Sequence, residues 1–232
     1  MKIVLQNNKI NVKINSLGAY VEKFSFDSKP IFYPKSQITI QGKVKTRGGM
    51  HPCCPNFSVD EISDLPSHGF IRDLEFEVLY LSNEFVKLKS IGIGNYKNVD
   101  FFIEYSINEN SLNAQLRVKN KSDHAVPLAP AFHPYFYLEN FKVDIANFEI
   151  KKDKLPQTQF LETNSVQFSC NGKNLSIRGE NVNVFAIWSD SIDKYLCIEP
   201  TYNGVAFVKN SKNIYYLNPD KEFFQKITIE LL

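Results

Sequence analysis

Three side chains suited to proton transfer, His68, His133 and Glu199, stand in segments that interrupt an otherwise regular sequence pattern. Imidazole has an unperturbed pKa of about 6.5, so a histidine can give or accept a proton near neutral pH. A glutamate is rarely buried without a partner, so one that ends an apolar run either lies at a rim or has a chemical task. Together these residue types indicate general acid–base chemistry.

Each of the three residues also has a structural explanation. His68 precedes Gly69 and is typical of a turn histidine whose ring lies half in solvent. His133 lies among aromatic residues between two prolines, where an imidazole can simply satisfy a backbone group. Glu199 shares a face with Cys197 if that run is a strand, because side chains alternate. The aromatic neighbours of His133 and Glu199 also suit a sugar site, since the apolar faces of a sugar pack on rings.

Other chemistries lack their motifs in this sequence. His51, Cys53 and Cys54 could suggest a metal site, but there is no second ligand cluster with zinc spacing, and we expect no metal. We expect Cys53 and Cys54 instead to alternate between core and rim. The sequence has no G-x-S-x-G elbow, no P-loop, no G-x-G-x-x-G after a strand and no H-x-H pair of a cupin.

The elements that position these residues are predicted to be β-strands. Apolar residues alternate with polar ones in residues 10–14, 101–107, 111–119 and 226–231, which is the pattern of a sheet with one buried face. The 19 Phe and 11 Tyr agree, and Asn-rich turn signals separate the runs. No long window shows a helical period. The sequence therefore predicts an all-β fold, a large twisted antiparallel β-sandwich.

Prolines mark the three segments that hold the candidate residues. They stand within residues 46–57 together with 66–72, within 130–136 and within 195–200. Proline cannot donate to a β-ladder, so it is confined mostly to edge strands or bulges. We therefore expect each candidate residue to lie beside a backbone irregularity.

Length and charge bound the class of protein. The chain has 232 residues, which we expect to form one domain over residues 1–232. Its 27 Lys+Arg against 25 Asp+Glu give a net charge of +2, too little for a nucleic-acid or anionic-membrane surface. We find no secretory signal or membrane span, and the four cysteines resemble reduced thiols, so we expect a cytoplasmic protein. The oligomeric state is not readable from the sequence.

Four motifs in order resemble the aldose 1-epimerase (mutarotase) family, in the branch that includes the glucose-6-phosphate and other hexose-6-phosphate 1-epimerases. The matching motifs are Arg47-Gly48-Gly49 with Pro52 and Pro55-x-Phe57, Ser67-His68-Gly69-Phe70-Ile71-Arg72, Phe132-His133-Pro134-Tyr135-Phe136 and Cys197-Ile198-Glu199-Pro200. The resemblance covers about residues 40–232 and implies a galactose mutarotase-like sandwich, in agreement with the strand pattern.

The resemblance also implies an activity, the interconversion of the α and β anomers of an aldose. By resemblance, Glu199 is the base at the C1 hydroxyl, His133 is the acid at the ring oxygen, and His68 hydrogen-bonds near the ring oxygen. The reaction removes one proton and adds one, so it needs neither a metal nor an organic cofactor. Reversal of the reaction exchanges the two roles.

Substrate contacts follow from the same resemblance. Arg47 and Arg72 match positions that contact sugar hydroxyls or the phosphate of a sugar phosphate, and Arg72 could instead pair with a nearby acid. An aspartate on substrate hydroxyls is expected before the final glutamate. Asp190 is favoured over Asp193 because it directly follows the strand end at Trp188. His51 departs from the family, where an apolar residue or proline is usual.

Two alternatives to an epimerase remain open at this point. A non-catalytic sugar-binding β-sandwich would keep the pocket but lose the acid or the base, and this sequence retains both. A purely structural or interaction sandwich would leave the acid–base set unexplained. The identity of the sugar, and whether it is phosphorylated, is not readable from the sequence.

Overall fold

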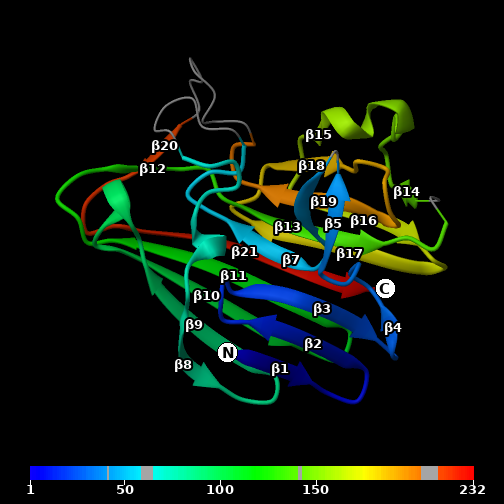
Figure 1. The fold of residues 1–232 in the computed structure, drawn as a ribbon, viewed down its shortest axis with the longest axis horizontal. Helices are drawn as coiled ribbons and strands as arrows, with labels where there is room; N and C mark the ends of the chain where they lie inside the picture. Colours follow the sequence, from blue (N-terminus) through cyan, green and yellow to red (C-terminus); the bar gives the residue numbers. More distant parts are fainter. Residues whose placement is uncertain (41, 59–64, 141–142, 205–213) are drawn as a thin grey trace.

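A computed structural model describes residues 1–40, 42–58, 65–140, 143–204 and 214–232. Two large antiparallel sheets and two small ones make up the fold (Figure 1). Three short 3-10 helices connect strands: η1 (Ile71–Asp73), η2 (Gly94–Tyr96) and η3 (Lys152–Gln157). None of the helices in the described ranges is long and apolar enough to cross a membrane.

The first large sheet has nine strands in the order β1-β2-β3-β7-β13-β19-β18-β15, with β4 paired to β3. Its strands are β1 (Lys2–Gln6), β2 (Ile10–Asn15), β3 (Tyr20–Phe26), β4 (Lys29–Pro30), β7 (Met50–Cys53), β13 (Ala131–Tyr137), β15 (Gln159–Leu161), β18 (Val184–Trp188) and β19 (Tyr195–Thr201).

The second large sheet has eight strands in the order β14-β16-β17-β21-β11-β10-β9-β8. They are β8 (Glu77–Leu81), β9 (Phe85–Ile91), β10 (Val99–Ile107), β11 (Ser111–Asn120), β14 (Val143–Ile145), β16 (Ser165–Cys170), β17 (Lys173–Glu180) and β21 (Glu222–Leu231). Two two-stranded sheets complete the described part of the fold: β5 (Ser36–Ile40) with β6 (Lys43–Arg47), and β12 (Val126–Leu128) with β20 (Tyr215–Leu217).

One hydrophobic core fills the space between the two large sheets. It takes alternate residues from each strand, such as Val12 from β2 and Leu116 from β11, both fully buried. The strand pairs in both sheets are antiparallel throughout, as the run from Ile103↔Leu116 to Leu112↔Ile229 illustrates. The predicted all-β antiparallel sandwich and the alternation in residues 10–14, 101–107, 111–119 and 226–231 are confirmed.

Of the two positions expected for the proline-containing segments, an edge strand or a backbone irregularity, the edge position does not occur in β7, β13 and β19, whereas the ladder between β13 and β19 is interrupted. Strands β7, β13 and β19 are neighbours in the middle of the nine-stranded sheet. Proline has no backbone N–H to donate, and in these central strands the result is a local interruption of the ladder rather than an edge position. The ladder between β13 and β19 holds at Ala131↔Thr201 and resumes at Tyr135↔Cys197, with no regular pairs between them, in the stretch that contains Pro134. The sheet tolerates the prolines because tertiary packing, rather than an unbroken ladder, holds these strands.

The middle strands have one face in the core and the other turned away from the second sheet. Phe132 and Phe136 of β13 point into the main core, whereas Tyr135 belongs to a separate small cluster with Cys197. Leu196 of β19 likewise points into the core. The residues that alternate with these core residues, which include His133 and Glu199, therefore lie on the outer face.

Gly69 holds the segment that carries His68 against the sheet. Its φ is +66°, and a Cβ built there would lie 2.0 Å from the carbonyl oxygen of Cys54. His68 itself has a φ of 69°, in the left-handed region that non-glycine residues rarely adopt. The close approach of the two backbones fixes the position of the His68 backbone, from which the imidazole side chain extends.

We expect Gly69→Ala to lower the free energy of unfolding by at least about 2 kcal/mol, because the methyl group adds a backbone clash to the left-handed strain. Urea unfolding at neutral pH measures the change. Gly172→Ala is the matched control, since Gly172 has a φ of +69° but nothing within 4 Å of its built Cβ. Equal losses in both variants would show that the contact with Cys54 does not constrain the segment.

Candidate active site

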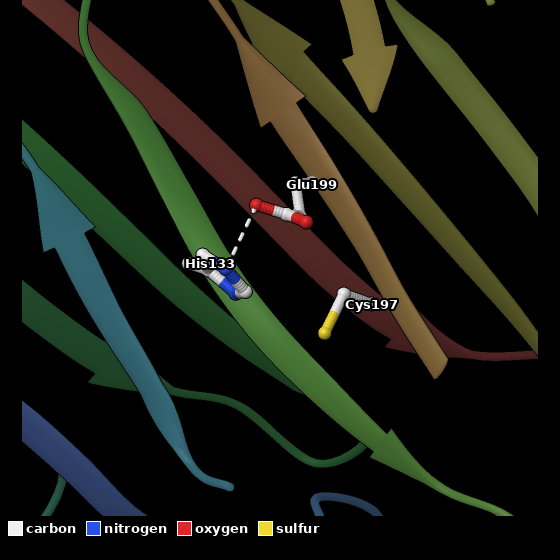
Figure 2. A group of neighbouring side chains, drawn as sticks. All are labelled: His133, Cys197 and Glu199. Atoms are coloured by element: carbon white, nitrogen blue, oxygen red, sulfur yellow. Dashed lines mark ion pairs between the residues drawn. The ribbon is translucent and has the colours of Figure 1, made fainter. Parts of the chain in front are cut away.

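His51, His133 and Glu199 lie side by side on the outer face of the nine-stranded sheet. His133 of β13 pairs with His51 of β7, and the flanking register places it opposite Glu199 of β19. The His133 Nε2 and Glu199 Oε2 atoms are 3.2 Å apart, and their side chains are only 4% and 2% exposed (Figure 2). The sheet therefore brings the predicted acid and base into direct contact across the gap in its ladder.

Burial governs the electrostatics of this pair. Removal from water raises the pKa of Glu199 well above its usual value. The pKa of His133 is well below its usual value, first through burial and then through the nearby His51 and His68 rings. Both shifts favour the uncharged forms.

His68 completes the group from the loop before η1. Its ring centroid lies 4.9 Å from that of His133 and 5.7 Å from that of Phe57. Burial, with Arg72 as the next cause, lowers the pKa of His68 to about 4. The residue does stand in a turn, but its ring packs among aromatic rings at the site rather than lying half in solvent.

His51 is a third histidine in the site, and its position was not predicted from the sequence. Its ring centroid lies 4.9 Å from that of His133 and 5.3 Å from that of Tyr20. Nδ1 lies 3.4 Å from the Pro52 carbonyl oxygen, and burial holds the pKa well below its usual value. Alternation places His51 on the same face as Cys53, but only the strand register could have placed it beside His133.

Arg47 is held at one wall of the site by an acidic and a phenolic side chain. Its Nε donates to Asp190 Oδ2 at 3.0 Å and to Tyr195 Oη at 3.1 Å. Tyr195 in turn donates to Asp190. The guanidinium carbon lies 5.2 Å from the centre of the Trp188 ring. The structure thus brings Arg47 and Asp190 together, with Asp190 positioned to fix the guanidinium.

Asp193, the alternative to Asp190, has a different partner. Tyr33 donates its hydroxyl to Asp193 Oδ2 at 2.5 Å. The pKa of the Asp193 carboxyl is lowered, mainly by that hydrogen bond. Among the described residues, Arg47 is bonded to Asp190 and not to Asp193. The preference for Asp190 as the aspartate at the site is therefore consistent with the geometry, while contact with substrate stays a prediction.

Arg72 faces the cavity from η1. Its Nη2 donates to the Ser67 carbonyl oxygen at 3.1 Å, and its Nε lies 3.9 Å from Asp73 Oδ2. Of the two acids that could pair with Arg72, Asp73 is the partner, whereas Glu75 lies near the N-terminal amine and Ser16. The Asp73 contact is long and its carboxyl is largely exposed, so it holds the guanidinium weakly.

These side chains surround a cavity of about 870 Å³, within the range of small-molecule sites of about 300–1,000 Å³. His51, His133 and Glu199 form part of its lining, with His68, Arg47 and Arg72 around them. Aromatic rings and two lysines also line it: Tyr20, Phe57, Tyr135, Phe160, Trp188, Lys35 and Lys45. The cavity can hold a ligand with apolar faces and several polar groups.

The cysteines near the site are all buried thiols. Cys53 and Cys54 are both fully buried, so the expectation that one of them lies at the rim is wrong. Alternation does place them on opposite faces, with Cys54 in the main core and Cys53 in a small cluster on the outer face. The second face of the sheet is covered by the cavity walls, which is why alternation does not expose either thiol.

Solved structures with the same fold define the class of this protein. A galactose mutarotase-like protein from Lactobacillus casei has a TM-score of 0.82 at 14% identity, with all of both chains covered. A galactose mutarotase related enzyme from Lactobacillus acidophilus has a TM-score of 0.78 at 19% identity over 100% of this chain and 97% of the other. The fold is therefore the galactose mutarotase-like sandwich.

The sequence itself assigns the family. The model of the family described as aldose 1-epimerase matches residues 1–203. The chain belongs to the aldose 1-epimerase family. No curated protein matches the sequence significantly.

We expect the buried His51 to make the protein less stable in acid. The unfolded chain binds a proton at this residue below about pH 6.5, whereas the folded chain keeps it neutral, so the free energy of unfolding falls as pH falls. His51→Gln removes this dependence. Between pH 6 and 5, the stability of the variant should fall less steeply than that of the native protein, by up to about 1.4 kcal/mol per pH unit. Urea unfolding at pH 7, 6 and 5 measures the slope.

His124→Gln is the control for this measurement. His124 is exposed, and its pKa is raised by the neighbouring Asp123, so its removal should not make the acid dependence shallower. The same slope in His51→Gln and the native protein would contradict a buried neutral His51.

Proposed function

We propose that the protein is an aldose 1-epimerase that interconverts the α and β anomers of a hexose or hexose 6-phosphate. The observation that carries the proposal is the buried contact between His133 and Glu199, 3.2 Å apart at a cavity of sugar size. Membership of the aldose 1-epimerase family supports it. An acid and a base in contact suit a reaction that removes one proton and adds another.

The proposed reaction opens and recloses the sugar ring. Glu199 takes the proton of the C1 hydroxyl while His133 gives a proton to the ring oxygen, and the bond between C1 and the ring oxygen breaks. The C1–C2 bond of the open aldehyde rotates. Closure on the other face of the carbonyl returns both protons, with the roles reversed. The protein ends each turnover with the one proton that the pair held at the start.

The resting protonation of the pair fits this cycle with one adjustment. Burial favours the uncharged forms of both groups, whereas the proposed roles begin with an ionised Glu199 and a protonated His133. Hydrogen bonds from sugar hydroxyls favour an ionised carboxylate, so substrate binding moves the proton toward the imidazole over a short path. His68, neutral at pH 7 because its pKa is about 4, is available to hydrogen-bond near the ring oxygen.

The walls of the cavity suit a pyranose. Trp188 and Tyr135 offer aromatic surfaces for the apolar face of the ring. Arg47, already oriented by Asp190, has further N–H groups for hydroxyls. The lysines Lys35 and Lys45 and the weakly paired Arg72 add positive charge around the cavity, which supports a phosphorylated sugar as one of the substrates.

We expect Glu199→Gln and His133→Ala each to lower the rate of anomer exchange by about 10²–10⁴-fold, because each removes one proton-transfer group. NMR exchange spectroscopy on equilibrated anomers of glucose, galactose and glucose 6-phosphate measures the rate. Glu180→Gln, at an exposed residue of β17, should be unaffected. Full activity in both site variants would refute the assigned roles, and sugar binding without faster exchange would favour a non-catalytic binding module.

We expect Arg72→Gln to raise KM for glucose 6-phosphate at least about tenfold more than KM for glucose, because guanidinium–phosphate pairs are strong, charge-assisted contacts. Steady-state kinetics with both sugars measures the ratio. Arg178→Gln, at an exposed strand residue paired with Glu230, is the control. Equal effects on the two sugars would argue against a phosphate contact at Arg72.

A further inference from the structure

Three donor atoms of different chemistry lie close together at the cavity, where His133 and Glu199 are part of the lining and Cys197 is their fully buried neighbour. Nitrogen, sulfur and carboxylate oxygen atoms of His133, Cys197 and Glu199 lie within 4.8 Å of one another, and all three residues are buried (Figure 2). Cys197 and Glu199 are two residues apart on β19 and share its outer face. His133 faces them from the adjacent β13. The proposed epimerase reaction uses the imidazole and the carboxylate but has no use for the thiol.

Two of these donors already have the spacing of ligands on one ion. Zinc bonds to nitrogen and oxygen are about 2.0–2.2 Å long, which puts two ligands of a tetrahedral site about 3.3–3.5 Å apart. The His133 Nε2 and Glu199 Oε2 atoms are 3.2 Å apart. Glu199 Oε2 is nevertheless without a hydrogen-bond partner among the described residues, so the two atoms approach without the alignment of a hydrogen bond.

The thiol requires only a small adjustment. A zinc–sulfur bond of about 2.3 Å would place the Cys197 sulfur about 3.5 Å from the other two donors. It must therefore approach by about 1 Å, and the proposal requires that the Cys197 side chain make this movement within its buried cluster. His68 can supply a fourth ligand, because its ring lies 4.9 Å from that of His133 and its Nδ1 lacks a partner among the described residues.

We propose that this cavity binds a borderline-soft divalent cation of the zinc type through His133, Cys197 and Glu199, and that the cation excludes the sugar. Imidazole and thiolate ligands favour such ions over magnesium or calcium, which prefer oxygen. The cation occupies the atoms that would contact the substrate, so it acts as a reversible inhibitor. The exclusion of sugar rests on the proposed function, whereas binding of the ion does not.

Titration of the purified protein with ZnCl₂ against a chromogenic chelator tests the site without any sugar. We expect one ion per chain, and affinity lowered at least about tenfold in Cys197→Ser, since even loss of an outer-shell partner costs about 10–100-fold. Glu199→Gln provides a second variant should Cys197→Ser fold poorly. MgCl₂ should show no binding.

Two controls separate the site from other donors. Cys170→Ser removes a buried thiol on β16 and should leave zinc binding unchanged. His124→Gln removes the exposed histidine beside Asp123, which could hold a surface ion. Unchanged affinity in both Cys197→Ser and Glu199→Gln, or no zinc binding at all, would overturn the proposal.

An activity assay then separates this inference from the proposed function. Zinc should slow anomer exchange competitively with sugar, and EDTA should restore it. Zinc binding to a protein without epimerase activity would remove the proposed function and leave the metal site intact. Full epimerase activity with no zinc binding would remove only the metal site.

Discussion

The exclusion of water from two titratable groups is the constraint on which the site depends. His133 and Glu199 are almost fully buried, and burial drives their pKa values in opposite directions, which disfavours the charged form of each. A pair of this kind in water would hold separate charges and gain little from proximity. The aromatic walls and the neighbouring histidine rings are what remove the solvent. The reactive pair is therefore a property of the whole cavity, not of two residues.

The two-faced middle strands solve the problem of placing such a pair precisely. Phe132 and Ile198 anchor β13 and β19 in the main core, while His133 and Glu199 project from the other face. Each reactive side chain is thus flanked in sequence by residues that cannot move without disturbing the core. The register is the same on both sides of the gap beside Pro134, so the sheet itself places His133 opposite Glu199.

The alternation of residues within each strand predicted which side chains share a face, but it did not predict which strands pair with one another. Alternation put Glu199 and Cys197 on one face, and the motifs identified His68 and His133, because these signals lie within a few residues. Strand register is a long-range property, so nothing in the sequence placed His51 beside His133 or joined Arg47 to Asp190, 143 residues away. The prolines did not indicate that these strands are central in the sheet, for the same reason. A central position depends on packing between segments that are far apart in the sequence.

The β5–β6 pair is a small sheet of its own, outside both large ones, and it carries Lys45, Thr46 and Arg47 into the wall of the cavity. Among the residues that the structure describes, its strands pair with each other and not with the sandwich. Evolution can therefore lengthen, shorten or recharge this hairpin without rebuilding the core that positions His133 and Glu199. Substrate preference can diverge among relatives at this hairpin while the scaffold for proton transfer stays unchanged, and an engineer seeking altered sugar selectivity would begin there.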